Sequence, residues 1–344
     1  MKTNKVLVTG AGGFIGTLMV EMLLKNKCSV VALDRYFFGV DKLKAFENHT
    51  NLKIVKEDTR YVSESIFKDI DIVIDLAGLS NDASCEIDPS LTHNINNLGA
   101  IRMIKAAKKA GVRRYIYSSS ASVYGFNEAL GLNETGDQNP QTIYAKSKVA
   151  VEETLLQERT KNFEVVMLRN ATVYGVAPRM RMDLCINIMT ARAWSEGIIK
   201  IENGGMQWRP FVHVRDVVKA FELVMKADGK LVDGEAFNVG SNEQNYTISD
   251  IANLVAKELP RTAIHNTGDD MDYRSYNLNF DKIERVLGYK PSMSVSDGIK
   301  EVIKALEKKV ITYDDPKGYT LQWYINLMEW EKRVKELSYD GKMF

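Results

Sequence analysis

One stretch decides the fold: Val6-Leu-Val-Thr-Gly10-Ala-Gly-Gly13-Phe-Ile-Gly16. Residues 5–9 form a short apolar run with β-branched valines, which predicts a buried strand, and residues 14–24 follow the period of a helix. The glycines between them are spaced G-x-x-G-x-x-G, and a turn this tight needs residues without a β-carbon. A helix that begins there presents free N–H groups and the positive end of its dipole to a ligand. We therefore predict that a dinucleotide pyrophosphate binds at Gly10, Gly13, Phe14, Ile15 and Gly16.

An acidic residue after the next predicted strand supports this prediction. Ser29-Val-Val-Ala-Leu33 predicts a strand, and Asp34 follows it about 20 residues past the glycines, where dinucleotide folds bind the adenosine ribose. Arg35 can stack on the adenine or receive a 2′-phosphate, but Asp34 would repel that phosphate, which favours NAD over NADP. The alternative is a glycine-lined turn without a ligand, beside a solvated aspartate. The coincidence of three signals makes this alternative the weaker one.

The composition excludes several classes of function. Lys and Arg outnumber Asp and Glu by only one over 344 residues, so no basic field predicts nucleic-acid binding. Cys28, Cys85 and Cys185 are scattered, so we predict no metal site, no disulfide framework and a reducing cytoplasmic location. No apolar run approaches the length of a membrane span, and residue 5 already lies in a predicted strand. We therefore expect neither a membrane anchor nor a signal peptide.

Strands and helices alternate through the first half of the chain. Further strands are predicted at 52–55, 71–75, 113–118 and 163–168, and helices at 89–110 and 143–158. This alternation predicts the α/β class, with a doubly wound parallel (Rossmann) sheet and a smaller C-terminal substrate-binding lobe. We expect an NAD-binding domain over 1–175 with returning segments near 209–240, and the lobe and C-terminal helices mainly over 176–344. The later predicted elements are strands at 211–214 and 235–239 and helices at 215–227, 247–259, 281–287, 295–308 and 319–337.

Hydroxyl groups follow the fifth predicted strand. Tyr115-Ile-Tyr-Ser118-Ser-Ser120-Ala-Ser122-Val-Tyr-Gly125 places serines at the carboxyl end of a strand, where open α/β sheets bind ligands. Tyr144 and Lys148 share one face of a predicted helix. The ammonium of Lys148 favours the phenolate, as does oxidised nicotinamide, so we expect a lowered pKa for Tyr144. Tyr144 then accepts a proton from a carbinol while hydride leaves for the cofactor. The alternative is a surface tyrosine beside a solvated lysine.

Taken together, these motifs resemble the extended short-chain dehydrogenase/reductases, and within them the NAD-dependent sugar-nucleotide epimerase/dehydratase family. The resemblance rests on G-x-x-G-x-x-G at 10–16, S-S-S-A-S-V-Y-G at 118–125, Y-x-x-x-K at 144–148, L-R-N-A-T-V-Y-G at 168–175 and R-P-F-V-H-V-x-D at 209–216. It covers most of the chain and implies NAD as the cofactor and a nucleotide-diphosphate sugar as the substrate. It also implies a homo-oligomer, a dimer or a tetramer, paired through the helices near 90–110 and 143–158.

The resemblance implies a role for individual residues. Tyr144 is similar to the catalytic acid/base of the family, Lys148 to its partner at the nicotinamide ribose, and Ser120 to the hydroxyl that binds the sugar C4 oxygen. Further implied cofactor-binding residues are Asp34, Arg35, Asp58, Thr59, Leu76, Ala77, Gly78, Asn96, Ser118 and Tyr174. The implied substrate-binding residues are Ser120, Ser122, Asn170, Asn187, Arg209 and Arg274, and the two arginines suit a diphosphate.

Several positions depart from the patterns of the family and narrow the chemistry. The 4,6-dehydratases carry Asp-Glu after the hydroxyl residue, whereas Ala121 and Ser122 here offer neither an acid nor a base for loss of water. The 3,5-epimerases place a cysteine base where this chain has Ser122. Ser80 replaces a lysine of the UDP-galactose 4-epimerases, and Thr172 replaces an asparagine that contacts phosphate. The chemistry that these residues retain is hydride transfer at C4 of a nucleotide-linked sugar.

This chemistry leaves several functions open. A 4-epimerase returns the hydride to the other face of the sugar, a 4-dehydrogenase releases a 4-keto sugar, and a 4-ketoreductase runs that reaction in reverse. A non-nucleotide ketone as substrate is disfavoured, because an apolar substrate needs no pair of arginines. A non-catalytic dinucleotide-binding regulator is disfavoured too, because such proteins typically lack the tyrosine or the lysine, and Tyr144 and Lys148 are both present.

Overall fold

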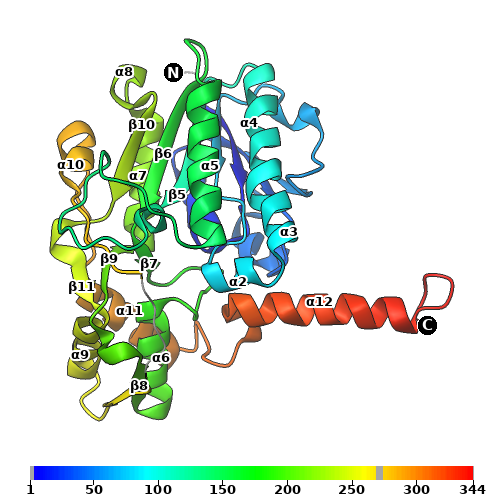
Figure 1. Ribbon diagram of the computed structural model, residues 1–344. Coiled ribbons are helices and arrows are strands. Elements are labelled where there is room, and N and C mark those ends of the chain that lie inside the picture. The colour runs from blue at the N-terminus through cyan, green and yellow to red at the C-terminus, as the bar shows by residue number, and fades with distance from the viewer. Residues whose placement is uncertain (1–3, 269–273, 344) are drawn as a thin grey trace.

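A seven-stranded parallel sheet forms the centre of the molecule (Figure 1). The computed structural model describes residues 4–268 and 274–343. The strand order is β10-β6-β5-β4-β1-β2-β3, and each neighbouring pair is parallel. The strands are β1 (Lys5–Thr9), β2 (Ser29–Asp34), β3 (Leu52–Lys56), β4 (Ile72–Asp75), β5 (Arg114–Ser120), β6 (Glu164–Asn170) and β10 (Glu235–Val239). The order reverses between β1 and β4, which opens a crevice at the carboxyl ends. The predicted doubly wound sheet is confirmed.

Helices cover both faces of this sheet (Figure 1). On one face α1 (Phe14–Lys25) packs beside α7 (Val214–Lys226), and on the other α4 (Ala100–Lys109) packs beside α5 (Ile143–Glu158). Successive residues of β1 alternate between the two cores, since Val8 belongs to the core under α1 and α7 and Leu7 to the core under α4 and α5. Because both faces are buried, the central strands are almost continuously apolar.

The chain beyond β6 builds a smaller lobe with its own core, as predicted. Its two small sheets have the orders β11-β9-β7 and β12-β8. The elements are β7 (Thr172–Tyr174), α6 (Cys185–Glu196), β8 (Ile198–Ile201), β9 (Trp208–His213), β11 (Asn245–Thr247), α9 (Ile248–Glu258), β12 (Ala263–Asn266) and α11 (Val295–Glu307), whereas α10 (Asp281–Leu287) packs against β10 of the central sheet. Ile186, Phe211, Ile251 and Ile299 are fully buried in the core of this lobe. Short helical turns complete the chain: η1 (Val40–Phe46), η2 (Glu64–Phe67), η4 (Ala121–Tyr124), η5 (Asn203–Gly205), α8 (Gly229–Val232) and η6 (Asn242–Gln244).

The helix predicted at 89–110 is present, but its hydrogen-bond pattern is not uniform. The segment consists of α3 (Pro89–Thr92), a π-helical stretch η3 (His93–Gly99) and then α4. Asn96 lies in the π-helical stretch, and its amide bonds the backbone of Leu79 twice, accepting from N at 2.9 Å and donating to O at 3.1 Å. Contacts with a loop outside the helix thus accompany a local geometry that the helical period does not encode.

The C-terminal segment crosses from the lobe to the sheet and then leaves the body of the molecule (Figure 1). The turn η7 (Pro316–Gly318) precedes α12 (Thr320–Leu337), whose first half contacts α2 (Asp82–Glu86). The buried Trp323 donates from Nε1 to the carbonyl oxygen of Phe37 at 2.8 Å. From residue 329 to the end of α12 the side chains are exposed. Within the described ranges no helix, α12 included, has the length and apolarity that crossing a membrane requires.

Candidate active site

The glycine turn between β1 and α1 has the geometry of an anion site. Gly10 has φ +64°, and a Cβ there would lie 2.8 Å from the backbone of Leu76. A Cβ on Gly16 would lie 2.1 Å from the carbonyl oxygen of Gly10, so neither position admits a side chain. Gly13 caps α1 without a side-chain hydrogen bond, and among the described residues a Cβ there would meet Gly10 alone. The N-terminus of α1 is therefore open to a ligand, and this cradle fits the pyrophosphate of NAD.

A hydrogen-bond network fixes the loop at the end of β4 against this turn. The hydroxyl of Thr9 accepts from the N–H groups of Leu76 at 3.1 Å and Ala77 at 3.0 Å, and it donates to Asp75 at 2.5 Å. The other carboxylate oxygen of Asp75 accepts from the hydroxyl of Tyr115 at 2.6 Å. Adjacent ends of β1, β4 and β5 are thereby tied together, which holds the predicted cofactor loop 76–78 in one conformation.

Asp34 lies beside the glycine turn, as the sequence predicts. Its carboxylate accepts from the N–H of Gly12 at 3.0 Å and from that of Tyr36 at 2.6 Å. Burial raises the pKa of Asp34, while these backbone hydrogen bonds lower it in part. The carboxylate is thus oriented over the turn, where a ribose would bring its hydroxyls.

The adenine-side residues gather at the ends of β2 and β3. Asp58 receives two hydrogen bonds from the guanidinium of Arg60, at 3.0 and 2.7 Å, and lies 3.5 Å from Arg35. The hydrogen bonds from Arg60 hold the pKa of Asp58 below its usual range. Arg35 also lies over the ring of Phe37, with its guanidinium 5.1 Å from the ring centre. The structure therefore brings Asp34, Arg35 and Asp58 to one edge of the sheet.

The structure also brings Ser120, Tyr144 and Lys148 together. Ser120 ends β5, Tyr144 lies in the first turn of α5, and the Ser120 hydroxyl lies close enough to the Tyr144 phenol to lower its pKa in part. The ammonium of Lys148 donates to the carbonyl oxygen of Ser118 at 2.6 Å and lies 5.5 Å from the centre of the Tyr144 ring. Thr142 caps α5 by accepting from the N–H of Ala145 at 3.1 Å, which fixes where the helix begins.

The expected lowering of the Tyr144 pKa is wrong for the chain by itself. Burial raises the pKa of Tyr144, and the carboxylate of Asp82 raises it further, whereas the hydrogen bond with Ser120 lowers it. Burial also lowers the pKa of Lys148 to about 8. The spacing of the two residues predicted that they are neighbours, but desolvation of both groups is larger than the effect of their mutual charge.

Asn170 and the serines around Ser120 leave one acceptor open. The amide nitrogen of Asn170 donates to the hydroxyl of Ser118 at 3.0 Å, while its amide oxygen is buried without a partner among the described residues. The hydroxyl of Ser122 donates to that of Ser120 at 3.0 Å. Asn170 stands opposite Ser120 in the register of β5 and β6. A buried, unpaired oxygen at this strand end suits a ligand that carries hydroxyl groups.

Arg209 and Arg274 meet at the mouth of the site, and Asp82 links them to α5. The guanidinium of Arg209 donates to the carbonyl oxygens of Trp208, at 2.8 Å, and Arg274. The guanidinium of Arg274 pairs with Asp82, which also accepts from the hydroxyl of Thr142. Sequence reasoning missed Asp82. The available signal was Asn81, whose side chain accepts from the N–H of Ser84 at 2.7 Å and so caps α2.

Asn187 and Tyr174 have structural positions instead of the predicted ligand positions. Both side chains are fully buried. The amide of Asn187 accepts from the N–H of Gly175 at 3.0 Å and donates to the carbonyl oxygen of Arg181 at 2.8 Å. The hydroxyl of Tyr174 donates to Gln244 at 2.8 Å. Each of these side chains fixes β7 or the segment that follows it. Binding a ligand through either side chain would therefore require its hydrogen bonds to break.

Two further ion pairs near the site were not predicted. Arg181 bonds Asp183 twice, at 3.1 and 3.0 Å, and reaches the hydroxyl of Ser80 at 3.3 Å. Behind β5, Glu152 and Arg169 form a buried pair at 2.7 Å, and the hydroxyl of Ser119 donates to Glu152 at 2.5 Å. The contacts of Arg181 with Ser80 and of Glu152 with Arg169 join residues of different segments, so local patterns do not indicate them.

Comparison with known proteins agrees with this geometry. Residues 6–240 match the model of the NAD dependent epimerase/dehydratase family. A UDP-glucose 4-epimerase of Mycolicibacterium smegmatis is 31% identical over 319 residues, covering 89% of this chain and 99% of that protein. UDP-glucuronic acid decarboxylase 6 of Arabidopsis thaliana is 28% identical over 310 residues, 86% of each chain. The solved structure of MoeE5 in complex with UDP-glucuronic acid and NAD is 27% identical and has a TM-score of 0.76, covering 89% of this chain and 100% of that one. The fold, the glycine turn that fits NAD and these similarities show that the chain belongs to the NAD-dependent epimerase/dehydratase family.

Proposed function

We propose that this protein oxidises C4 of a nucleotide-linked sugar and returns the hydride to the opposite face, as a 4-epimerase. The observation that carries the proposal is the closeness of the Ser120 and Tyr144 hydroxyl groups, one helical turn from the buried ammonium of Lys148. A UDP-glucose 4-epimerase among the relatives supports this choice. A 4-dehydrogenase would use the same residues, and a 4-ketoreductase would use them in reverse.

The side chains divide the work of one proton transfer. Bound NAD would supply the hydride acceptor and a positive charge that favours the phenolate. Tyr144 accepts the proton of the C4 hydroxyl as the C4–H bond breaks, and Ser120 holds the C4 oxygen. Lys148 holds the carbonyl oxygen of Ser118 and so fixes the strand end beneath the phenol. After the sugar turns over, Tyr144 returns the proton and the C–H bond forms on the other face.

The residues around this pair argue against loss of water. Ala121 and Ser122 follow Ser120 and carry no carboxyl group. The nearby thiol of Cys85 is no substitute base, because burial raises its pKa to about 12 and leaves it neutral. A proton can therefore leave the C4 hydroxyl, but Ala121, Ser122 and the neutral thiol of Cys85 offer no base to take one from a neighbouring carbon.

We assign the diphosphate of the substrate to Arg209 and Arg274, because guanidinium groups bind phosphate oxygens in pairs. Asp82 orients Arg274 through their ion pair. The NAD contacts proposed at residues 10–16, 34–35, 58–59 and 76–78 are those that the sequence predicts, and Asn96 supports the last of these loops. The exposed Leu98 of η3 and Leu156 of α5 suit pairing of two copies through these helices, as in the predicted homo-oligomer.

The variant Tyr144→Phe tests the proposal. It should retain NAD released on denaturation and the melting temperature of the wild type, while kcat falls by about 10²–10⁴-fold, the usual contribution of a positioned acid/base. Tyr339→Phe is the matched control, since Tyr339 is 90% exposed and distant in sequence. Unchanged turnover in Tyr144→Phe would overturn the mechanism.

A panel of UDP-, GDP-, CDP- and dTDP-sugars, including UDP-glucose and UDP-glucuronic acid, then identifies the reaction. A product of unchanged mass with no net NADH supports the 4-epimerase. A product that has lost two hydrogens with accumulating NADH shows a 4-dehydrogenase. Loss of carbon dioxide from UDP-glucuronic acid, or loss of water from any sugar, overturns the proposal. Bound NAD without turnover of any member of the panel points to a 4-keto substrate or to a regulator.

A further inference from the structure

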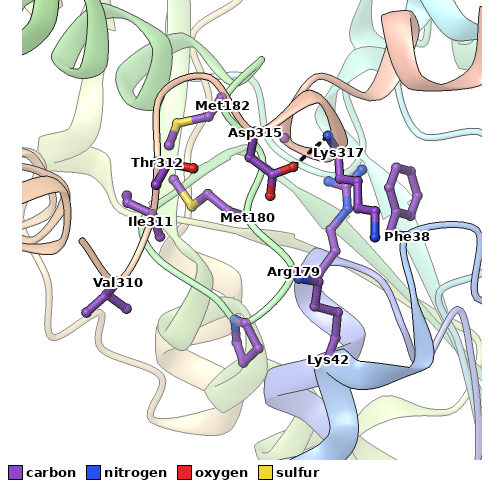
Figure 2. Close-up of a pocket in the computed structure, with 12 residues that line it drawn as sticks. Phe38, Lys42, Arg179, Met180, Met182, Val310, Ile311, Thr312, Asp315 and Lys317 are labelled. Atoms are coloured by element: carbon purple, nitrogen blue, oxygen red, sulfur yellow. Dashed lines mark hydrogen bonds between the residues drawn. The ribbon is translucent and has the colours of Figure 1, made fainter. Parts of the chain in front are cut away.

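A cavity of about 110 Å³ lies where the segment after β2, the beginning of the lobe and the C-terminal segment meet (Figure 2). Its lining includes Phe38 and Lys42 from the first segment, Arg179 and Met182 from the second, and Asp315 and Lys317 from the third. None of the predicted cofactor or substrate residues lines it. The cavity is therefore a separate feature of the molecule, and the C-terminal segment closes one side of it.

Arg179 is buried in the wall of this cavity with part of its hydrogen-bonding capacity unused. Its side chain is only 3% exposed, and one terminal nitrogen donates to the hydroxyl of Thr320 at 2.9 Å. Its Nε and its other terminal nitrogen are buried and have no partner within the described part of the chain. The guanidinium lies 3.7 Å from the centre of the Phe38 ring, which fixes its plane. A buried charged group with two unsatisfied donors is costly unless an acceptor reaches it.

The carboxylates that attract Arg179 are already engaged. Asp183 accepts two hydrogen bonds from Arg181, and Asp34 accepts from the backbone beside the glycine turn. Burial and the charge of Arg181 lower the pKa of Arg179 to about 10, so the guanidinium keeps its charge at neutral pH. The missing acceptor is therefore not one of these two side chains.

The charges around the cavity favour an anion. Lys42, Arg179 and Lys317 line it, against the single carboxylate of Asp315 among the lining residues of the described chain. Asp315 accepts from the N–H of Lys317 at 3.0 Å as the cap of η7. Figure 2 shows Arg179, Lys317 and Phe38 close together on one side of the cavity. A small anion there would meet two or three positive groups at once.

We propose that this cavity binds a phosphate-type oxyanion on Arg179, with Lys42 and Lys317 at its rim. The unused N–H groups of the guanidinium can donate to phosphate oxygens, and its charge favours such an anion. The cavity exceeds the roughly 10–15 Å³ that one water needs, which leaves room for a small oxyanion. The oxyanion is a free molecule, because the pyrophosphate of NAD is assigned to the glycine turn, none of whose residues lines this cavity. The proposal does not depend on the reaction at C4.

Thermal unfolding of the purified holoprotein in inorganic phosphate and in chloride of equal ionic strength tests the site. Phosphate should raise the melting temperature of the wild type by about 2 °C or more, and Arg179→Gln should lack this shift. Equal NAD content in the two proteins then shows a free oxyanion. If phosphate has no effect on either protein but Arg179→Gln loses at least tenfold in NAD affinity, Arg179 supports the cofactor site indirectly and the proposal is overturned.

The proposal is overturned if phosphate does not shift the wild type and Arg179→Gln binds NAD as the wild type does. Lys42→Gln keeps the test decisive if Arg179→Gln does not fold, because Lys42 lies at the rim and is partly exposed. Lys42→Gln should reduce the phosphate shift, whereas Lys290→Gln, at a lysine that is 74% exposed, should leave it unchanged. Equal shifts in all three proteins would contradict the assignment.

Discussion

The glycine turn and the Arg179 cavity satisfy their polar groups in opposite ways. At the turn, Thr9 and Asp75 find partners on neighbouring strand ends, and their hydrogen bonds close a complete network. At the cavity, Arg179 is held by Thr320, 141 residues further along the chain, and two of its nitrogens have no partner among the described residues. A complete network makes a rigid platform for a ligand, whereas an incomplete one makes a place where a ligand supplies the missing bonds.

The two regions also differ in how the chain specifies them. The sheet positions Ser120 and the loop after β4 because parallel strands end at one edge. The cavity needs three segments that the sheet does not align, and the C-terminal segment joins them through Thr320 and Trp323. Damage to the sheet side should therefore cost the most stability, and damage to the C-terminal side should cost less.

The largest effect is expected from Glu152→Gln, behind the catalytic strand. The change removes the negative charge that lies 2.7 Å from the guanidinium of Arg169. The buried positive charge of Arg169 is then left without a counter-charge. We expect a loss of about 3–5 kcal/mol in the free energy of unfolding, measured by urea denaturation. The neighbouring Glu153→Gln is the control, because Glu153 is exposed and its loss should stay within about 0.5 kcal/mol. A loss below about 1 kcal/mol for Glu152→Gln would show that the pair does not support the sheet side.

A smaller effect, dependent on pH, is expected from Lys148. Burial lowers its pKa from 10.5 to about 8, so between these values the unfolded chain binds a proton that the folded chain lacks. Stability must then rise with pH across this window, since ∂ΔG/∂pH is positive where the unfolded state holds more protons. Relative to Lys148→Met, the wild type should gain up to about 3 kcal/mol from pH 8 to pH 10.5.

Urea denaturation of both proteins at steps across this window measures the gain. Lys146→Met, at an exposed position two residues away, should show no such dependence. A difference between wild type and Lys148→Met that stays flat or falls with pH would contradict the buried position of the ammonium.

The sequence predicts well those features of the fold and the site that depend on residues close together in the chain. The spacing of the glycines, the strand that ends at Asp34 and the helical spacing of Tyr144 and Lys148 all depend on neighbours within a few residues or one turn. Asp82 escaped prediction because it pairs with Arg274, 192 residues away in the chain. The direction of the Tyr144 pKa was wrong for a related reason, since burial is a property of the assembled fold.

Asn187 shows that a tertiary contact can also occupy a residue for which the resemblance implies a ligand. Its position in the chain suggests a nucleotide ligand by resemblance, but its amide is fully buried against Gly175 and Arg181. The helix at 89–110 follows the predicted period except where Asn96 binds the loop after β4. In each case a tertiary contact, absent from any local pattern, decides the outcome.

The smallest effect is expected from Thr320→Val, which sharpens the comparison at the C-terminal side. Thr320 is fully buried, and valine keeps its shape but removes the hydroxyl that Arg179 uses. We expect a loss of about 1–3 kcal/mol in the free energy of unfolding, because a third donor of a buried guanidinium becomes unpaired. Thr320→Ser, which restores the hydroxyl without the methyl group, should recover most of the loss.

Urea denaturation in chloride buffer compares the three proteins. If Thr320→Val is as stable as the wild type, the bond to Arg179 contributes nothing to stability. If instead the loss matches that of Glu152→Gln, the two regions depend equally on their polar contacts for stability. The difference between a complete and an incomplete hydrogen-bond network would then not affect the free energy of unfolding.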